Sequence, residues 1–211
     1  MKIKVCGLAK VDQVKLLHEL GVDYFGFIFY PNSPRYALNY LTLNEIKSLQ
    51  DIYKIGVFVN EKLEDVVRVA QEAQLNAIQL HGEESNSYLR EVSNKLSKSV
   101  HIIKVIRIGN QSIKELQKSL EDLPEVVNFI LFDTDSKQYG GTGESFSWKL
   151  LDQLNIRKPY FLSGGISLEN IHQVSQLRNQ PYAIDINSKF EVSPGVKDIN
   201  SVNKLLHHIK N

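Results

Sequence analysis

The chain has almost no cysteine, since Cys6 is the only one in 211 residues. A single cysteine excludes an intramolecular disulfide and a zinc site built from several thiolates. No apolar run approaches the about 18–20 residues of a membrane-spanning helix. The first residues also lack the long apolar stretch of a signal peptide. We therefore expect a protein of the reducing cytoplasm with no membrane partner.

An excess of charge is also missing, because 25 Lys and Arg are balanced by 24 Asp and Glu to a formal net charge of +1. A near-neutral chain has no global field for holding nucleic acid. No His, Asp and Glu residues stand at metal-ligand spacing. The glycines at 140–143 lack the lysine of a Walker A loop, and no dinucleotide fingerprint follows the first apolar run. We expect no nucleic acid, metal or cofactor, and a local site for any anion.

Short apolar runs and segments with helical spacing alternate along the whole chain. Hydrophobic residues make up 42% of the chain, enough for a sizeable core. The expected strands are residues 3–6, 24–29, 53–59, 77–80, 101–106, 129–132, 160–162 and 182–186. The expected helices are residues 11–20, 43–49, 63–73, 88–96, 113–120, 148–154, 168–177 and 199–209.

Strict alternation of strand and helix predicts an α/β protein with a parallel sheet joined by helical crossovers. Eight units of roughly 26 residues suit a closed (β/α)8 TIM barrel that is shorter than usual. An open doubly wound sheet is the competing fold, which periodicity does not exclude. No linker or shift in composition divides the chain, so we expect a single barrel domain over residues 1–211.

Polar and glycine residues gather where the expected strands end. A barrel carries its active site on these ends, in the loops that lead into the helices. They are Cys6-Gly7, the segment from Tyr30 to Arg35, Asn60, His81-Gly82, Asp133-Thr134, Ser163-Gly164-Gly165 and Asn187-Ser188.

Cys6 is a candidate base or nucleophile at the end of the first strand. Alternation along that strand sends Ile3 and Val5 outward to the helices, so Lys4 and Cys6 point into the barrel. A nearby ammonium favours the thiolate and lowers the pKa of the thiol towards neutrality. The alternative, a small buried hydrophobic residue, remains open at this point.

Three further strand-end side chains are candidates. Asp133 closes an apolar strand, where desolvation raises the pKa of a carboxyl and suits it to acid or base work; a helix cap is the alternative. Arg35 follows a loop stiffened by two prolines, well placed to bind a carboxylate in bidentate fashion, although a solvated loop arginine fits equally. His81 can line the mouth of the barrel.

The glycine-bearing loops suggest a phosphate site. Gly141 lies in a stretch suited to a lid or to close backbone approach to a ligand. Loops after the seventh and eighth strands of such barrels often hold a phosphate through exposed amides. The candidates there are Gly164, Gly165, Asn187 and Ser188, with simple turn glycines as the alternative.

Taken in order, these motifs resemble the phosphoribosylanthranilate isomerase family of tryptophan biosynthesis. The resemblance runs from Lys4 to Asp198. It rests on Lys4-Val5-Cys6-Gly7, Gly26-Phe27-Ile28-Phe29, Ser33-Pro34-Arg35, Gly56-Val57-Phe58-Val59, Gln79-Leu80-His81-Gly82, Asp133, residues 140–143 with Phe146 and Trp148, Ser163-Gly164-Gly165-Ile166 with Glu169-Asn170, and Pro194-Gly195-Val196-Lys197-Asp198.

The resemblance implies an Amadori rearrangement of N-(5-phosphoribosyl)anthranilate, without a cofactor, in a monomer or a homodimer. It implies that Cys6 is the general base and Asp133 the general acid, and that Arg35 holds the carboxylate of the substrate. The implied phosphate cradle consists of Gly164, Gly165 and the amides of Asn187 and Ser188.

The sequence departs from the family pattern after the eighth strand, where Lys189 replaces a usual glycine. Loss of that glycine can disturb a turn with positive φ, whereas the lysine can add a charge for the phosphate. We expect retained activity with altered phosphate affinity. The alternatives are another phosphate-binding barrel enzyme that acts on a sugar phosphate, and a non-catalytic barrel.

Overall fold

Eight parallel strands close into a barrel in the computed structural model, which describes residues 1–134 and 146–210. Closure is direct, because β1 pairs with β8 from Lys2 opposite Ala183 to Val5 opposite Ile186. The predicted barrel is confirmed and the open sheet is excluded. The strands are β1 (Lys2–Val5), β2 (Tyr24–Ile28), β3 (Tyr53–Phe58), β4 (Ala77–Leu80), β5 (His101–Ile108), β6 (Phe129–Thr134), β7 (Tyr160–Leu162) and β8 (Ala183–Ile186).

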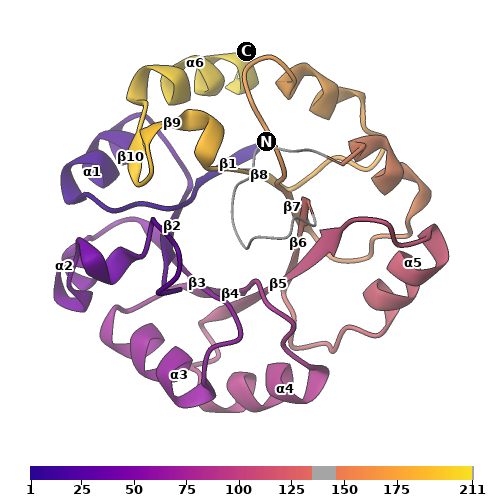
Figure 1. Cartoon of the computed structure of the whole chain (residues 1–211), viewed down its shortest axis with the longest axis horizontal. Coiled ribbons are helices and arrows are strands. Elements are labelled where there is room, and N and C mark those ends of the chain that lie inside the picture. The colour runs from indigo at the N-terminus through magenta and orange to yellow at the C-terminus, as the bar shows by residue number, and fades with distance from the viewer. Residues whose placement is uncertain (135–145, 211) are drawn as a thin grey trace.

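Helices surround the strands as an outer ring (Figure 1). None of the helices in the described ranges is long and apolar enough to cross a membrane. A two-stranded hairpin, β9 (Glu191–Ser193) with β10 (Val196–Lys197), precedes the last helix. The α-helices are α1 (Val11–Glu19), α2 (Leu43–Ser48), α3 (Leu63–Glu72), α4 (Asn86–Lys95), α5 (Ile113–Glu121) and α6 (Ile199–Lys210).

Two of the predicted helices are 3₁₀ segments rather than α-helices. They are η2 (Trp148–Gln153) and η3 (Ile171–Gln176), and two shorter 3₁₀ turns are η1 (Ala37–Asn39) and η4 (Ser188–Phe190). In both segments the buried residues recur at every third position, a spacing that fits a 3₁₀ helix but does not require one, because Val11, Val14 and Leu17 of the α-helix α1 share it. A three-residue period places them on one face of a 3₁₀ helix, with its three residues per turn. These positions are Trp148, Leu151 and Leu154, then Ile171, Val174 and Leu177.

The alternation along β1 sorts its side chains as predicted. Ile3 and Val5 belong to the large core between strands and helices. Cys6 belongs to a small cluster inside the barrel with Ile28 and Val57. The interior therefore receives the polar residues of β1, and the outer core receives the apolar ones.

Aromatic rings fill the end of the barrel at which the strands begin. Tyr24 packs edge-to-face on Tyr53, at 5.0 Å between ring centroids, and on Phe161 at 5.3 Å. The hydroxyl oxygens of Tyr24 and Tyr182 lie 2.8 Å apart. This layer closes one end, so a ligand has access to the interior only from the end at which the strands finish.

Candidate active site

Cys6 directly follows β1 with 5% of its surface exposed. The backbone of β2 closes over it, because a Cβ added to Gly26 would lie 2.9 Å from Sγ and 3.0 Å from Cα of Cys6. Only a glycine at position 26 lets β2 pack this closely against the thiol of Cys6. The predicted inward orientation of Cys6 is confirmed.

Below Cys6, three buried polar side chains meet in the barrel interior. Lys4 is fully buried and donates from Nζ to Oδ2 of Asp185 at 2.7 Å and to Oε1 of Gln79 at 2.8 Å. A buried ammonium is costly unless it is paired. The carboxylate of Asp185 supplies that pairing. The other carboxylate oxygen, Oδ1, is buried without a hydrogen-bond partner among the described residues.

The expected effect of Lys4 on Cys6 has the wrong direction. Burial raises the pKa of the Cys6 thiol, and the attraction of Lys4 and Lys197 does not offset burial and the negative charge of Asp185. Burial lowers the pKa of Lys4, but the charges and hydrogen bonds of Asp185 and Cys6 together outweigh burial and leave that pKa raised. In the free protein the thiol therefore holds its proton.

Asp133, near the end of β6, is the second strand-end candidate. Its Oδ2 lies 3.2 Å from Nε2 of His81, and its Oδ1 accepts the backbone amide of Thr134 at 2.9 Å. Burial favours the neutral acid, but the bonds from His81, Thr134 and Ser163 hold the pKa of Asp133 below its ordinary value. The predicted upward shift is therefore wrong, and the resting carboxyl is ionised.

Arg35 is buried in an ion pair rather than solvated. Its Nε donates to Oε2 of Glu191 at 2.8 Å, and Nη2 lies 2.7 Å from the same oxygen. No contact of Nη1 with the described part of the chain is found, so one edge of the guanidinium stays available. Gly7 makes room, because at φ +73° an added Cβ would lie 2.7 Å from Cδ of Arg35.

Lys197 is a site residue that the sequence singles out only as part of the motif Pro194-Gly195-Val196-Lys197-Asp198. It is buried and donates from Nζ to Glu191 at 2.6 Å and to Oδ1 of Asn187 at 2.7 Å. Burial lowers its pKa despite Glu191, whereas Arg35 and Lys197 together hold the pKa of Glu191 low against burial. Two cations and one carboxylate leave a net positive group beside Cys6.

The candidate phosphate residues lie on the ends of two adjacent strands. Gly164 and Gly165, after β7, have φ values of +87° and +73°. Their amides have no backbone acceptor among the described residues. Ser188 opens η4 after β8, which pairs with β7. The side-chain oxygen Oδ1 of Asn187 accepts from Lys197, which leaves its backbone amide and Nδ2 for a ligand.

Lys189 does not occupy a strained turn. The φ angle of Lys189 is not positive. Its exposed side chain attracts the carboxylate of Glu169, which lies in the loop after β7. The expected disturbance of a positive-φ turn is therefore wrong for this chain. Gly141, the remaining candidate, lies outside the residues that the structure describes.

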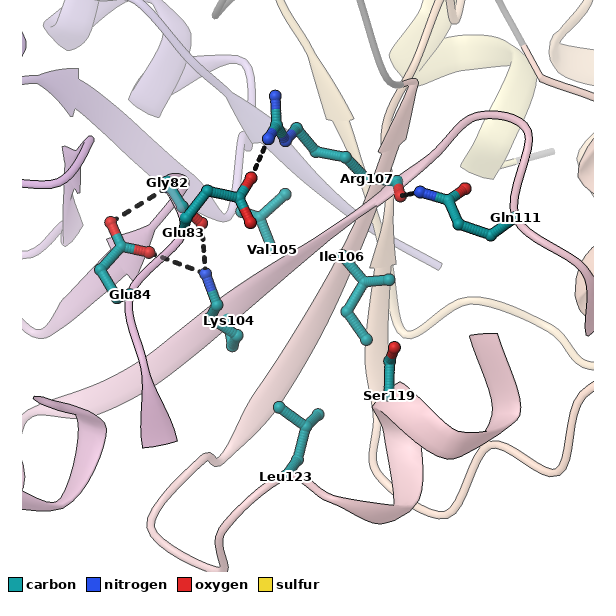
Figure 2. A pocket seen from close by; sticks show the side chains of 10 residues that line it. All are labelled: Gly82, Glu83, Glu84, Lys104, Val105, Ile106, Arg107, Gln111, Ser119 and Leu123. Carbon is teal, nitrogen blue, oxygen red and sulfur yellow. Dashed lines mark hydrogen bonds and ion pairs between the residues drawn. The ribbon is translucent and has the colours of Figure 1, made fainter. Parts of the chain in front are cut away.

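A second group of buried contacts supports the loop that carries His81. Lys104 of β5 donates from Nζ to the carbonyl of Gly82 at 2.6 Å and to Glu84 at 2.7 Å (Figure 2). The other oxygen of Glu84 accepts the amides of Gly82 and Asn60, both at 3.0 Å. Gly82, Glu84 and Lys104 line a pocket beside β5 and α5 that contains neither Cys6 nor Asp133. Lys104 and Glu84 thus fix the loop behind the site.

No cluster of three His, Cys, Asp or Glu residues in the described ranges is close enough to hold a metal ion. The groups that can act chemically are a thiol, a hydrogen-bonded carboxylate, a guanidinium paired with Glu191 on one side, and backbone amides that have no acceptor in the described part of the chain. Such a set can transfer protons and bind anions.

The chain matches the family described as N-(5'phosphoribosyl)anthranilate (PRA) isomerase over residues 3–208. An N-(5'-phosphoribosyl)anthranilate isomerase of Phocaeicola vulgatus is 34% identical, over 100% of this chain and 98% of that protein. The isomerase of Thermotoga maritima is 33% identical with the same coverage.

Solved structures show the same likeness. The Thermus thermophilus phosphoribosyl anthranilate isomerase has a TM-score of 0.82 at 27% identity, covering 100% of this chain and 98% of its own. A phosphoribosyl anthranilate isomerase in complex with reduced 1-(o-carboxyphenylamino)-1-deoxyribulose 5-phosphate has a TM-score of 0.78 at 29% identity, with the same coverage. The chain therefore belongs to the phosphoribosylanthranilate isomerase family.

Proposed function

We propose that this chain isomerises N-(5'-phosphoribosyl)anthranilate to 1-(2-carboxyphenylamino)-1-deoxyribulose 5-phosphate in tryptophan biosynthesis, with Cys6 as general base and Asp133 as general acid. Family membership over residues 3–208 supports the reaction. The single observation that carries the residue assignment is a series of side-chain hydrogen bonds inside the barrel. It runs from Lys4, beside Cys6, through Gln79 and His81 to Asp133.

The reaction needs one proton delivered and one removed. Protonated Asp133 gives its proton to the ring oxygen, the bond from that oxygen to C1 breaks, and the anthranilate nitrogen donates its electron pair to form a C1=N Schiff base that is protonated on nitrogen. The Cys6 thiolate then removes the proton from C2, which leaves a neutral enolamine. The enolamine becomes the ketone when C1 gains a proton and the C2 hydroxyl loses one.

The resting protonation of the pair is the reverse of the working one. The proton resides on Cys6 and the charge on Asp133, as their pKa shifts require. The working form, with Cys6 as a thiolate and Asp133 protonated, holds the same number of protons. It differs only in that one proton has moved from the sulfur of Cys6 to the carboxyl of Asp133. A dianionic phosphate bound at the amide of Gly164 would lie beside Asp133, because a Cβ added to Gly164 would be 3.4 Å from Oδ1 of that carboxylate, so the bound substrate favours the protonated form of Asp133.

The remaining groups fit the anionic substrate. The open edge of Arg35 is suited to the carboxylate on the aromatic ring. The free amides of Gly164 and Gly165, with those near Ser188, are suited to the phosphate. Oδ1 of Asp185, which has no partner among the described residues, is suited to accept a hydrogen bond from a sugar hydroxyl, which would satisfy that buried oxygen. No step of this chemistry requires a cofactor.

The test is the loss of fluorescence of freshly generated substrate with wild type, Cys6→Ser and Asp133→Asn. We expect wild type to turn over and each variant to lose about 10²–10⁴-fold in kcat, the range of a general acid or base. A matched control is Asp12→Asn on α1, away from the site. Wild-type kcat in both site variants would refute the assignment.

A non-catalytic barrel rested only on Lys189, and the backbone there is unstrained, so no observation favours it. We propose cytoplasmic location, a phosphorylated small molecule as the ligand, and one functional domain over residues 1–211. A related structure is described as that of mutually generated monomers of the dimeric phosphoribosylanthranilate isomerase of Thermotoga maritima. Monomer or homodimer stays a prediction for this chain, as does the lack of a nucleic-acid partner.

A further inference from the structure

Gln79 transfers no proton in the scheme above, yet its hydrogen bonds connect Lys4, beside Cys6, with His81, beside Asp133. It lies on β4 two residues before His81, so both side chains point into the barrel. Its Oε1 accepts from Nζ of Lys4 at 2.8 Å, and its Nε2 lies 3.1 Å from Nδ1 of His81. The opposite nitrogen of His81, Nε2, lies 3.2 Å from Oδ2 of Asp133.

The chemistry of Lys4 fixes the direction of every bond in this series. An ammonium is a donor only, so the atom of Gln79 that faces it must be the amide oxygen. The amide nitrogen, which is also a donor only, then faces Nδ1 of His81. Nδ1 must therefore accept and carry no proton, and the proton of the neutral imidazole must sit on Nε2.

We infer that Gln79, held by Lys4, is a positioning residue that keeps His81 as the Nε2–H tautomer and so presents a permanent donor to Asp133. The inference deepens the proposed function and rests on it for its catalytic meaning. Burial supports it, because Gln79 is 1% exposed and Lys4 is fully buried, so water does not compete for these bonds.

The tautomer matters at the moment when Asp133 gives up its proton. A donor at Nε2 stabilises the carboxylate that forms, and the amide of Thr134 stabilises its other oxygen. The other tautomer would direct a lone pair at the carboxylate and oppose proton release. Loss of Gln79 should therefore reduce kcat and leave KM nearly unchanged, because Gln79 itself lies beneath the substrate groups.

The test combines the tautomer of His81 with kinetics in Gln79→Met, which keeps the length of the side chain and removes both hydrogen bonds. Long-range proton–nitrogen correlation spectra of ¹⁵N-labelled protein report which imidazole nitrogen carries the proton, and His81→Gln assigns the signal among the six histidines. The matched control is Gln71→Met on the exposed face of α3.

We expect wild type and the control to show only the Nε2–H form of His81. Gln79→Met should show a mixture of tautomers and a kcat about 10–100-fold lower, as for partners that orient functional histidines, with KM within about twofold. Gln79→Glu, which still accepts from Lys4, should place a proton on Nδ1 of His81 and lose kcat similarly. The Gln79→Glu variant also serves as the readout if the Met variant does not fold.

A wild-type His81 protonated on Nδ1 would overturn the inference. So would an unchanged tautomer in both Gln79 variants, whatever their kcat, because Gln79 would then only fill space. Failure of the proposed function has a different signature. In that case wild type does not consume the substrate, while His81 still changes its tautomer when Gln79 is replaced.

Discussion

At the scale of the residue, the site depends on where two protons rest. Burial raises the pKa of Cys6 above its ordinary 9.0, and hydrogen bonds hold that of Asp133 below its ordinary 3.8. The proposed working form needs the opposite arrangement. Both forms hold one proton between the two groups. The fraction of protein molecules in the working form is therefore independent of pH between the pKa of Asp133 and the pKa of Cys6.

This reversal predicts a distinctive pH dependence for Asp133→Asn. Wild-type kcat/KM should form a broad bell that rises through the low pKa of Asp133 and falls through the high pKa of Cys6. The variant lacks the acid, so its residual activity depends on the thiolate alone. Its kcat/KM relative to wild type should rise about tenfold per pH unit below the pKa of Cys6.

The measurement is kcat/KM from about pH 6 to 9 for both proteins, taken as a ratio so that ionisation of the substrate phosphate cancels. Asp12→Asn, with an exposed carboxylate on α1, should give a constant ratio. A constant ratio for Asp133→Asn as well would show that the thiol is not the partner of Asp133.

At the scale of the element, the hairpin β9–β10 holds the guanidinium of Arg35 through Glu191 and Lys197. The folded pKa of Glu191 lies below its ordinary 4.5. Its charge therefore contributes stability that is present above the unfolded pKa and is lost as the pH falls through the folded pKa.

Glu191→Gln should remove that contribution. At neutral pH we expect the free energy of unfolding to fall by about 1–3 kcal/mol, because two buried cations lose their partner. Between about pH 5 and 3 the stability of the variant should fall less steeply than that of wild type. Urea unfolding at several pH values measures both effects, with the exposed Glu19→Gln as control. Equal pH slopes in variant and wild type would contradict this account of the hairpin.

The loop after β7 gives a second prediction at this scale. Gly164→Ala places a Cβ 2.5 Å from Oγ1 of Thr134 at φ +87°, next to Asp133. We expect the loop to shift, KM to rise and kcat to fall. Gly21→Ala is the matched control, since it has φ +85° after α1 but lies far from the site. The control should lose stability of about 1 kcal/mol and keep its kinetics. Equal kinetic effects in both variants would refute a role for the Gly164 loop in binding.

At the scale of the whole molecule, periodicity along the chain was sufficient for the barrel, because each strand and helix is visible in its local pattern. The ends of the strands, and hence Cys6 and Asp133, followed from the same pattern. The pattern predicts the 3₁₀ segments only as helices, because the three-residue spacing of Trp148, Leu151 and Leu154 also occurs in the α-helix α1.

Interactions across the barrel were beyond the reach of the sequence. Lys4 and its partner Asp185 are 181 positions apart, and Gln79 is 75 positions from Lys4. Without these partners, the sequence pattern predicts that Lys4 lowers the pKa of the Cys6 thiol. That direction is wrong. Ion pairs between side chains of different strands decide which charges shift the pKa of a neighbouring group. The local sequence pattern of one strand does not show which side chains of other strands it meets.

The measurement that tests the central claim most directly is the turnover of N-(5'-phosphoribosyl)anthranilate by Cys6→Ser, Asp133→Asn and the double variant. Because the residual activity of Asp133→Asn depends on the Cys6 thiolate, the double variant should be slower than Asp133→Asn and should lose the rise of its relative kcat/KM with pH. A double variant as fast as Asp133→Asn, or wild-type rates in either single variant, would contradict the claim.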